Sequence, residues 1–225
     1  MTPPTNGAAP SADVGVHIVS HSWSVKKAHY LVPRPPLIWI DDKPFPAPKD
    51  NATTAHGYHV IATDAAMDVT DPASILLNEY FYLPRVDETW SPHYEHMYRS
   101  MVHALLSAGD PGRQRVIIVS FGMAAHAPPP PIAYDYFMKL GAGEELQRWE
   151  NSRAPGERSA DYYIESPACY ALVGYSSLSY GRAIESYSDE IRAKDMAGID
   201  LEATLHNPIA APREDRTVDE PEPVD

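Results

Sequence analysis

Ten histidines in a chain of 225 residues raise the question of a metal site. His93, His96 and His103 lie in a segment with helical spacing, on the side opposite its apolar stripe. Zinc ligands on one helix are commonly four residues apart, as in H-E-x-x-H, and that spacing is absent. His56 and His59 stand three residues apart on an expected strand, where they point to opposite faces. We therefore expect a solvated histidine face, with no metal site and no cofactor.

Acidic residues gather where expected strands end, at Asp41, Asp42, Asp64 and Asp68. Paired carboxylates serve glycosidases, and oxygen ligands suit calcium. The spacing matches no calcium loop, and aspartates at strand ends commonly accept hydrogen bonds from the local backbone. We expect turn and strand-end roles for these side chains.

The single cysteine, Cys169, excludes an intrachain disulfide and the usual cysteine-based zinc site. It would be a nucleophile only with a base nearby and an electropositive setting. Because it precedes the apolar run YALVG, we expect a packed, unreactive thiol. We therefore predict no catalytic residues, and an enzyme that uses Cys169 or the acidic cluster is the least favoured reading.

The segment GYSSLSYG, residues 174–181, is rich in small and hydroxylated residues. It contains neither G-x-x-x-x-G-K-[ST] nor G-x-G-x-x-G, so a phosphate-binding loop is not expected. Tyr175 and Tyr180, with Arg182 and Trp149, are our candidates for a sugar-binding platform, since aromatic faces stack on sugars and arginine offers forked donors. The alternative hypothesis is a loop that reverses the direction of the chain and binds no ligand.

The elements that would position these residues alternate between strands and helices. Alternating and continuous apolar runs predict strands at 14–25, 37–41, 57–65, 75–84, 115–122 and within 162–175. Helical spacing of Tyr94, Met97, Tyr98, Met101, Val102 and Leu105 predicts a helix over 91–108, and shorter helices are expected at 132–141 and 188–198, with another turn near 144–149. Residues 174–188 are expected to form a loop and a short helix. The order indicates an α+β domain rather than a doubly wound fold.

Composition sets the remaining bounds. The formal net charge of −13 argues against nucleic-acid partners and anionic membrane surfaces, and no apolar run is long enough to span a membrane. The start of the chain lacks a signal-peptide pattern, so we expect synthesis in the cytoplasm. Proline is abundant in connecting and terminal stretches, as is typical of arms and tails. We divide the chain into a flexible arm at 1–13, an added strand region at 14–35, a domain at 36–200 and an acidic tail at 201–225.

An ordered set of motifs within residues 36–188 resembles the interleukin-like epithelial–mesenchymal-transition inducer (ILEI, or PANDER-like) family. These motifs are LIWIDD at 37–42, the G-x-x-V-x-x-x-D run from Gly57 to Asp64, the strand Val116–Val119, YFMKLGAG at 136–143, CYALVG at 169–174, and Gly181-Arg182-Ala183. The resemblance implies two small packed β-sheets with short outer helices and no known catalytic machinery. Secreted animal members depend on disulfides, which this chain cannot form.

Two functions follow as hypotheses. The first is a non-enzymatic structural, assembly or binding module in a virus particle, such as a phage tail or capsid surface. The fold that the resemblance implies is usual at cell surfaces, but this chain has no paired cysteines and has proline-rich arms. Such a combination suits a protein that folds in the cytoplasm and acts outside the cell. Its partners would be protein subunits that the terminal arms clasp. The second is a lectin-like module that binds surface glycans through Trp149 and residues 174–182.

Overall fold

The computed structural model describes residues 13–23, 35–48, 56–64, 67–68, 70–83, 90–109, 114–122, 125, 128–152, 168–175, 181–189 and 196–205. Their strands are β1 (Val14–Trp23), β2 (Leu37–Ile40), β3 (Lys43–Pro44), β4 (His56–Thr63), β5 (Ile75–Leu83), β6 (Arg115–Phe121), β7 (Cys169–Tyr175), β8 (Ile184–Ser188) and β9 (Met196–Leu205). Their helices are the short 3₁₀ turn η1 (Pro72–Ser74), α2 (Trp90–Ser107), α3 (Pro131–Lys139) and α4 (Glu144–Asn151).

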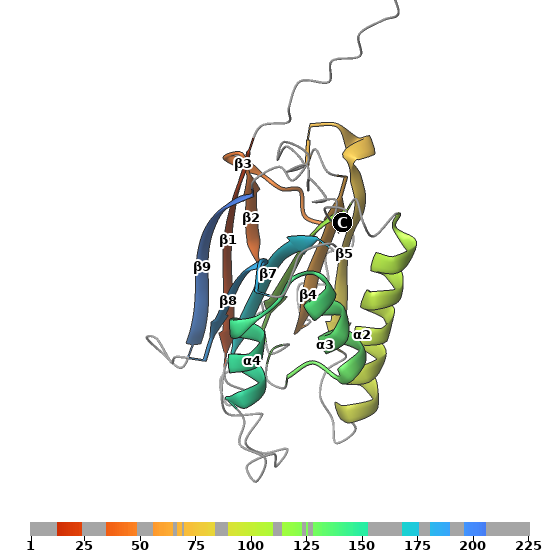
Figure 1. Cartoon of the computed structure of the whole chain (residues 1–225), viewed down its shortest axis with the longest axis vertical. Coiled ribbons are helices and arrows are strands. Elements are labelled where there is room, and N and C mark those ends of the chain that lie inside the picture. Colours follow the sequence, from red (N-terminus) through yellow and green to blue (C-terminus); the bar gives the residue numbers. More distant parts are fainter. Residues whose placement is uncertain are drawn as a thin grey trace, which may run out of the picture.

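The strands form two antiparallel sheets that pack face to face. Sheet A has the order β3-β2-β1-β9, and sheet B has the order β5-β4-β6-β7-β8. The three α-helices cover the other face of sheet B, which gives three layers (Figure 1). The predicted α+β class with two packed sheets and short outer helices is therefore confirmed.

The strands at the centre of sheet B are buried on both faces. Every residue of β4 and β6 is buried, as expected for strands with one face on sheet A and the other under helices. Gly57 in β4 lies so close to β5 that a Cβ atom there would stand 2.1 Å from the carbonyl oxygen of Phe81. Glycine is therefore required for this close approach of two backbones.

Two hydrophobic cores follow from the three layers. One lies between the sheets and includes Ile18, Ile40 and Ile117, and the other lies between sheet B and the helices. The predicted stripe of α2 enters the second core, where the Tyr58 and Tyr98 hydroxyls lie 2.6 Å apart. The Ser20 hydroxyl donates to the Ser120 carbonyl at 2.5 Å and thereby joins β1 of sheet A to β6 of sheet B.

The C-terminal part of the domain differs from the sequence prediction. We expected a loop and a short helix within residues 174–188. The helix is wrong, because Ile184–Ser188 form strand β8 beside β7. The helix expected over 188–198 is also wrong at its end, because β9 begins at Met196. Residues 201–205, which we assigned to the tail, belong to β9 and pair with β1. Residues 1–12 and 206–225, the bulk of the predicted arms, lie outside the described residues.

Candidate functional site

The predicted sugar platform is not assembled as expected. Trp149 is fully buried on α4, where its Nε1 donates to the Ala125 carbonyl at 3.1 Å and its ring packs on Tyr170 with centroids 4.7 Å apart. It has no ring face open to a sugar, so the prediction that Trp149 belongs to a sugar-binding platform is wrong. The half-buried Tyr175 ends β7 with the Arg115 guanidinium 5.6 Å from its ring centroid. Arg182 is exposed, and Tyr180 lies outside the described residues.

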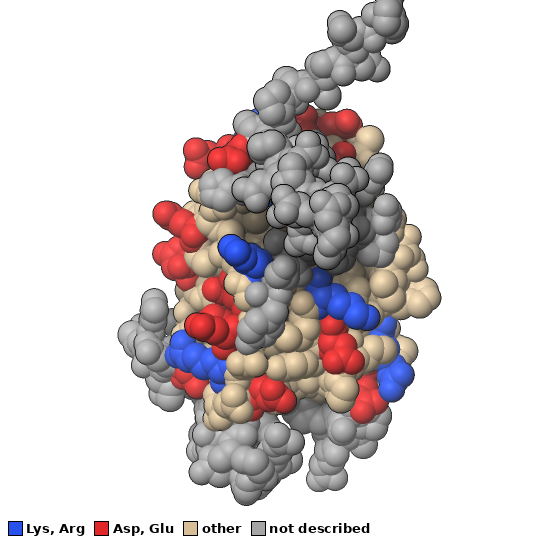
Figure 2. All heavy atoms as spheres, viewed as in Figure 1, with Lys and Arg blue, Asp and Glu red and all other residues tan. Residues whose placement is uncertain are grey.

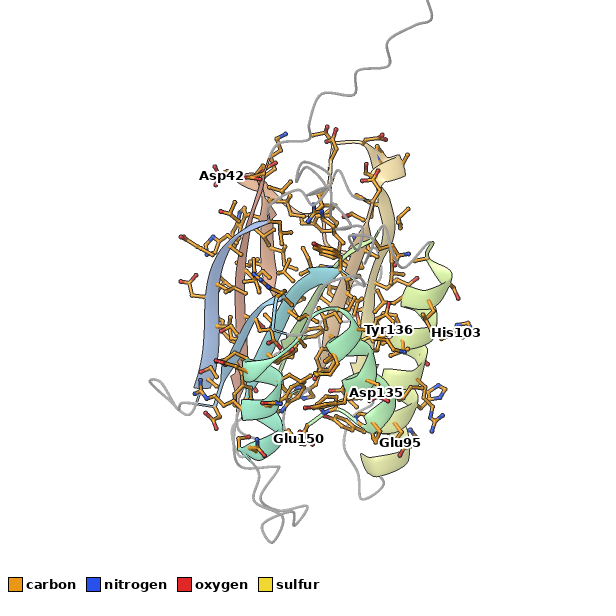
Figure 3. The ribbon with its side chains drawn as sticks, viewed as in Figure 1. Asp42, Glu95, His103, Asp135, Tyr136 and Glu150 are labelled. Atoms are coloured by element: carbon orange, nitrogen blue, oxygen red, sulfur yellow. The ribbon has the colours of Figure 1, made fainter. Side chains whose placement is uncertain are left out.

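The predicted solvated histidine face is present on α2. His93, His96 and His103 are exposed on α2, and His103 points away from the sheets (Figure 3). His56 and His59 are both buried on β4, where the alternation of a strand sends them to opposite faces. Within the described ranges, no group of three or more histidine, cysteine, aspartate or glutamate side chains could hold a metal ion.

Cys169 is a packed thiol between the sheets. It is fully buried, and its Sγ lies 3.6 Å from the Ala197 carbonyl oxygen. Burial raises the pKa of the thiol far above its ordinary value, which disfavours the reactive thiolate.

The predicted turn roles of the aspartates are confirmed for three of the four side chains. Asp64 accepts hydrogen bonds from the Met67 backbone and the Ser74 hydroxyl. Asp68 accepts from the Thr70 backbone and hydroxyl, which lowers the pKa of its carboxyl. Asp41 accepts from the Gly15 backbone N–H at 2.8 Å and so ties the β2–β3 turn to β1.

The outer face of sheet A gathers aromatic and acidic side chains from three neighbouring strands. Strand alternation turns His17 of β1, Trp39 of β2 and Glu202 of β9 to this face, and the three are cross-strand neighbours. The His17 and Trp39 rings stack with centroids 4.9 Å apart and planes inclined by 22°. His17 Nε2 lies 2.8 Å from the Asp200 carboxylate, also on β9.

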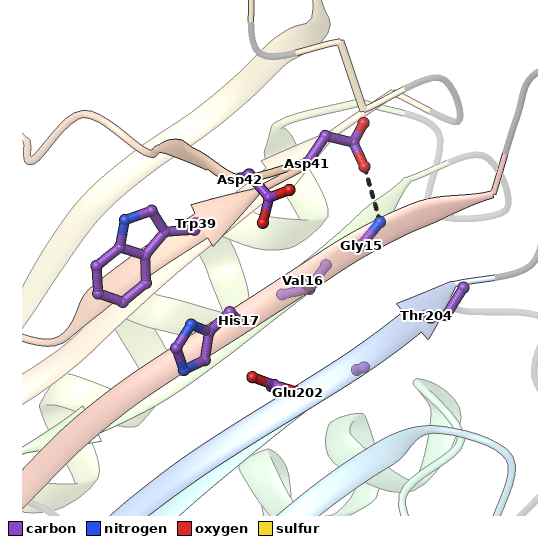
Figure 4. Close-up of a pocket in the computed structure, with 9 residues that line it drawn as sticks. Gly15, Val16, His17, Trp39, Asp41, Asp42, Glu202 and Thr204 are labelled. Carbon is purple, nitrogen blue, oxygen red and sulfur yellow. Dashed lines mark hydrogen bonds between the residues drawn. The ribbon is translucent and has the colours of Figure 1, made fainter.

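The turn between β2 and β3 completes the site. Asp41 and Asp42 form a two-residue hairpin loop with φ angles of 49° and 59°, the left-handed pair that a tight hairpin requires. The Gly15 hydrogen bond fixes this turn, and Figure 4 shows the Asp42 carboxylate on the same side as Trp39. The resulting shallow hollow of about 490 Å³ is lined by Gly15, Val16, His17, Trp39, Asp41, Asp42, Glu202, Ala203 and Thr204.

Three carboxylates line this hollow and are exposed to water, those of Asp41, Asp42 and Glu202. Aromatic faces beside carboxylates attract two kinds of group: cations, and hydroxylated rings with apolar C–H edges.

Sequence reasoning missed His17, Trp39 and Glu202 as site residues. A signal for Glu202 was present, since Ala197, Ile199, Leu201, Ala203 and Leu205 alternate with Gly198, Asp200, Glu202 and Thr204. That period of two is typical of a half-buried strand.

No protein-family model matches the chain, and no curated protein matches it either.

Proposed function

We propose that this protein is a non-enzymatic binding and assembly module of the ILEI-like class, and that the outer face of sheet A binds a basic segment of a partner protein. One observation carries the proposal: on a single sheet face, the exposed Leu37 and the half-buried Trp39 form a patch that four carboxylates border. The three-layer arrangement and the ordered motifs of residues 36–188 support the assignment to this class.

Exposure supports a docking role for this face. Leu37, which follows the same alternation as Trp39, is 58 % exposed, and the Asp200 side chain is 69 % exposed. No described helix covers this side of the molecule, and acidic side chains line it where β9 lies, at left in Figures 1 and 2. An apolar centre with a charged rim is the usual anatomy of a protein interface.

Charge complementarity supports the proposal of a basic partner. Asp41, Asp42, Asp200 and Glu202 border the patch, and the whole chain carries a formal net charge of −13. A lysine- or arginine-bearing segment would stack on Trp39 and pair with these carboxylates. Association would then be fast at low ionic strength and slower in salt.

The setting we propose is the surface of a virus particle, with the protein made in the cytoplasm and incorporated into the particle. The abundance of proline and the single buried cysteine support this proposal. Within the described residues, no helix is both long and apolar enough to cross a membrane. Mass spectrometry of purified particles from the source of this sequence tests the setting, and absence of the chain from all of them would refute it.

Glycan binding is the second candidate, and a specific observation favours it. The stacked rings of His17 and Trp39 lie in one hollow with the Asp42 and Glu202 carboxylates and the Thr204 hydroxyl. Aromatic faces pack on the C–H side of a sugar, while carboxylates accept hydrogen bonds from its hydroxyl groups.

Amide NMR titration of the labelled full chain separates the two candidates. The probes are an octa-arginine peptide and a panel of neutral mono- and disaccharides. We expect peptide-induced shifts in β1, β2 and β9 that weaken in salt and disappear in Trp39→Ala. The control Leu106→Ala, which alters an exposed leucine on α2, should leave them unchanged. Shifts with sugars alone would favour the second candidate, and no shift with either probe at millimolar concentration would refute binding at this face.

A further inference from the structure

A second cavity opens between the two sheets, and Leu37 and Trp39 of the outer face line part of it. It has a volume of about 470 Å³ and lies where β2 and β3 of sheet A face β4 and β5 of sheet B. Its lining is mostly apolar and includes Ile38, Pro44, Phe45 and Ala47, together with His59 and Tyr80. This size and lining are typical of small-molecule sites.

The tautomer of His59 follows from its neighbours. The Asn78 side-chain Nδ2 donates to the Pro46 carbonyl at 3.0 Å, which turns the Asn78 Oδ1 atom toward His59 as an acceptor. His59 Nε2 lies 2.8 Å from this Oδ1 and therefore carries the proton. Burial lowers the pKa of His59 to about 4, so the ring is neutral at pH 7 and its Nδ1 is a bare acceptor.

Two buried polar atoms beside this cavity have no hydrogen-bond partner among the residues that the structure describes. They are His59 Nδ1 and the Tyr80 hydroxyl, which belong to rings packed edge to face with centroids 4.8 Å apart. Burial raises the pKa of Tyr80 to about 12, so its hydroxyl keeps its proton at pH 7. Buried polar atoms without partners are uncommon in native proteins and call for a missing partner.

We propose that this inter-sheet cavity binds a small aromatic molecule with one hydrogen-bond donor, such as a phenol, whose donor is accepted by His59 Nδ1. The aliphatic and aromatic lining would hold the ring, and the orphan nitrogen would select for the donor. The cavity shares Leu37 and Trp39 with the outer face, but the nitrogen that would select the ligand, His59 Nδ1, lies between the sheets and takes no part in the proposed function.

Phenol and toluene test the proposal, because they have similar shapes and differ in the donor. We expect the full chain to bind phenol roughly fivefold more tightly than toluene, the ratio that corresponds to one neutral hydrogen bond. His59→Leu should reduce this ratio to about one. His103→Leu, at an exposed histidine on α2, is the matched control and should leave the ratio unchanged.

The ¹⁵N resonance of His59 Nδ1 gives a second readout that needs no variant. Phenol should move this resonance upfield as the nitrogen accepts a hydrogen bond, whereas toluene should not. Equal affinity for the two ligands in the unaltered chain, an unmoved Nδ1 resonance, or no binding of either at millimolar concentration would overturn the inference. An unaltered chain that binds no octa-arginine but keeps its preference for phenol would refute the proposed function alone.

Discussion

Replacing Trp149 by alanine tests whether this residue is part of the core or of a surface platform. Its side chain is fully buried between Tyr170 and Tyr187, and its indole N–H satisfies the Ala125 carbonyl. Removing a buried tryptophan costs about 3–5 kcal/mol, because transfer energy is lost and a cavity remains. We expect Trp149→Ala to lower the free energy of unfolding by about that amount, and Trp149→Phe by less.

Urea denaturation followed by far-ultraviolet circular dichroism is the suitable assay, because loss of a tryptophan alters fluorescence directly. The midpoint should fall while the slope of the unfolding free energy against urea stays unchanged. Trp39→Ala is the matched control on the outer face. Trp39 is half-buried and stacks on His17, and a cross-strand pair of this kind contributes up to about 1 kcal/mol.

A cost below about 1 kcal/mol for Trp149→Ala would refute the reasoning, since that is the usual effect of a surface substitution. The reversed order, with Trp39→Ala more destabilising than Trp149→Ala, would contradict the assignment of the two residues to surface and core.

Three further predictions concern stability. Gly57→Ala should destabilise by at least about 2 kcal/mol in thermal denaturation, because the new Cβ would meet the Phe81 carbonyl oxygen at 2.1 Å; an unchanged melting temperature would contradict this. His59, with its pKa lowered to about 4, should make the unfolding free energy fall by about 3 kcal/mol as pH drops from 6.5 to 4, because the unfolded chain takes up the proton first. Urea midpoints of His59→Gln should lack this part of the pH dependence. Tyr170→Phe should cost about 1–3 kcal/mol and raise the already elevated pKa of Glu185 further, because the carboxylate loses its 2.6 Å donor; a carboxyl NMR titration checks the shift.

The local elements could be predicted from the sequence where one period dominates. Strands β4 and β6 and helix α2 are examples. Apolar runs within the two strands and an apolar stripe along the helix are enough to predict each element and its burial. The assignment of Glu202 to an acidic tail is wrong, because its alternation with apolar residues is a strand pattern. Leu146 and Trp149, three apart on an otherwise polar helix, likewise indicated a buried face.

The candidate site could not be predicted, because it depends on pairing between distant segments. Trp39 and Glu202 both flank His17, but they come from strands near opposite ends of the described chain. Strand pairing is a tertiary property, and no local pattern specifies which partner lies on either side of β1. The left-handed turn at Asp41 and Asp42 was equally hidden, since the expectation of a strand end says nothing about its hairpin geometry.

The position of β1 between β2 and β9 has a consequence for biosynthesis. Sheet B can pair from segments that lie between residues 56 and 188, whereas sheet A requires β9, which leaves the ribosome last among the described strands. Loop closure across almost the whole chain is entropically costly and slow. The nascent chain would therefore expose the sheet B face that carries Ile117, Val119 and Cys169 until translation has passed residue 205, which makes this interval the point at which the chain most needs a chaperone.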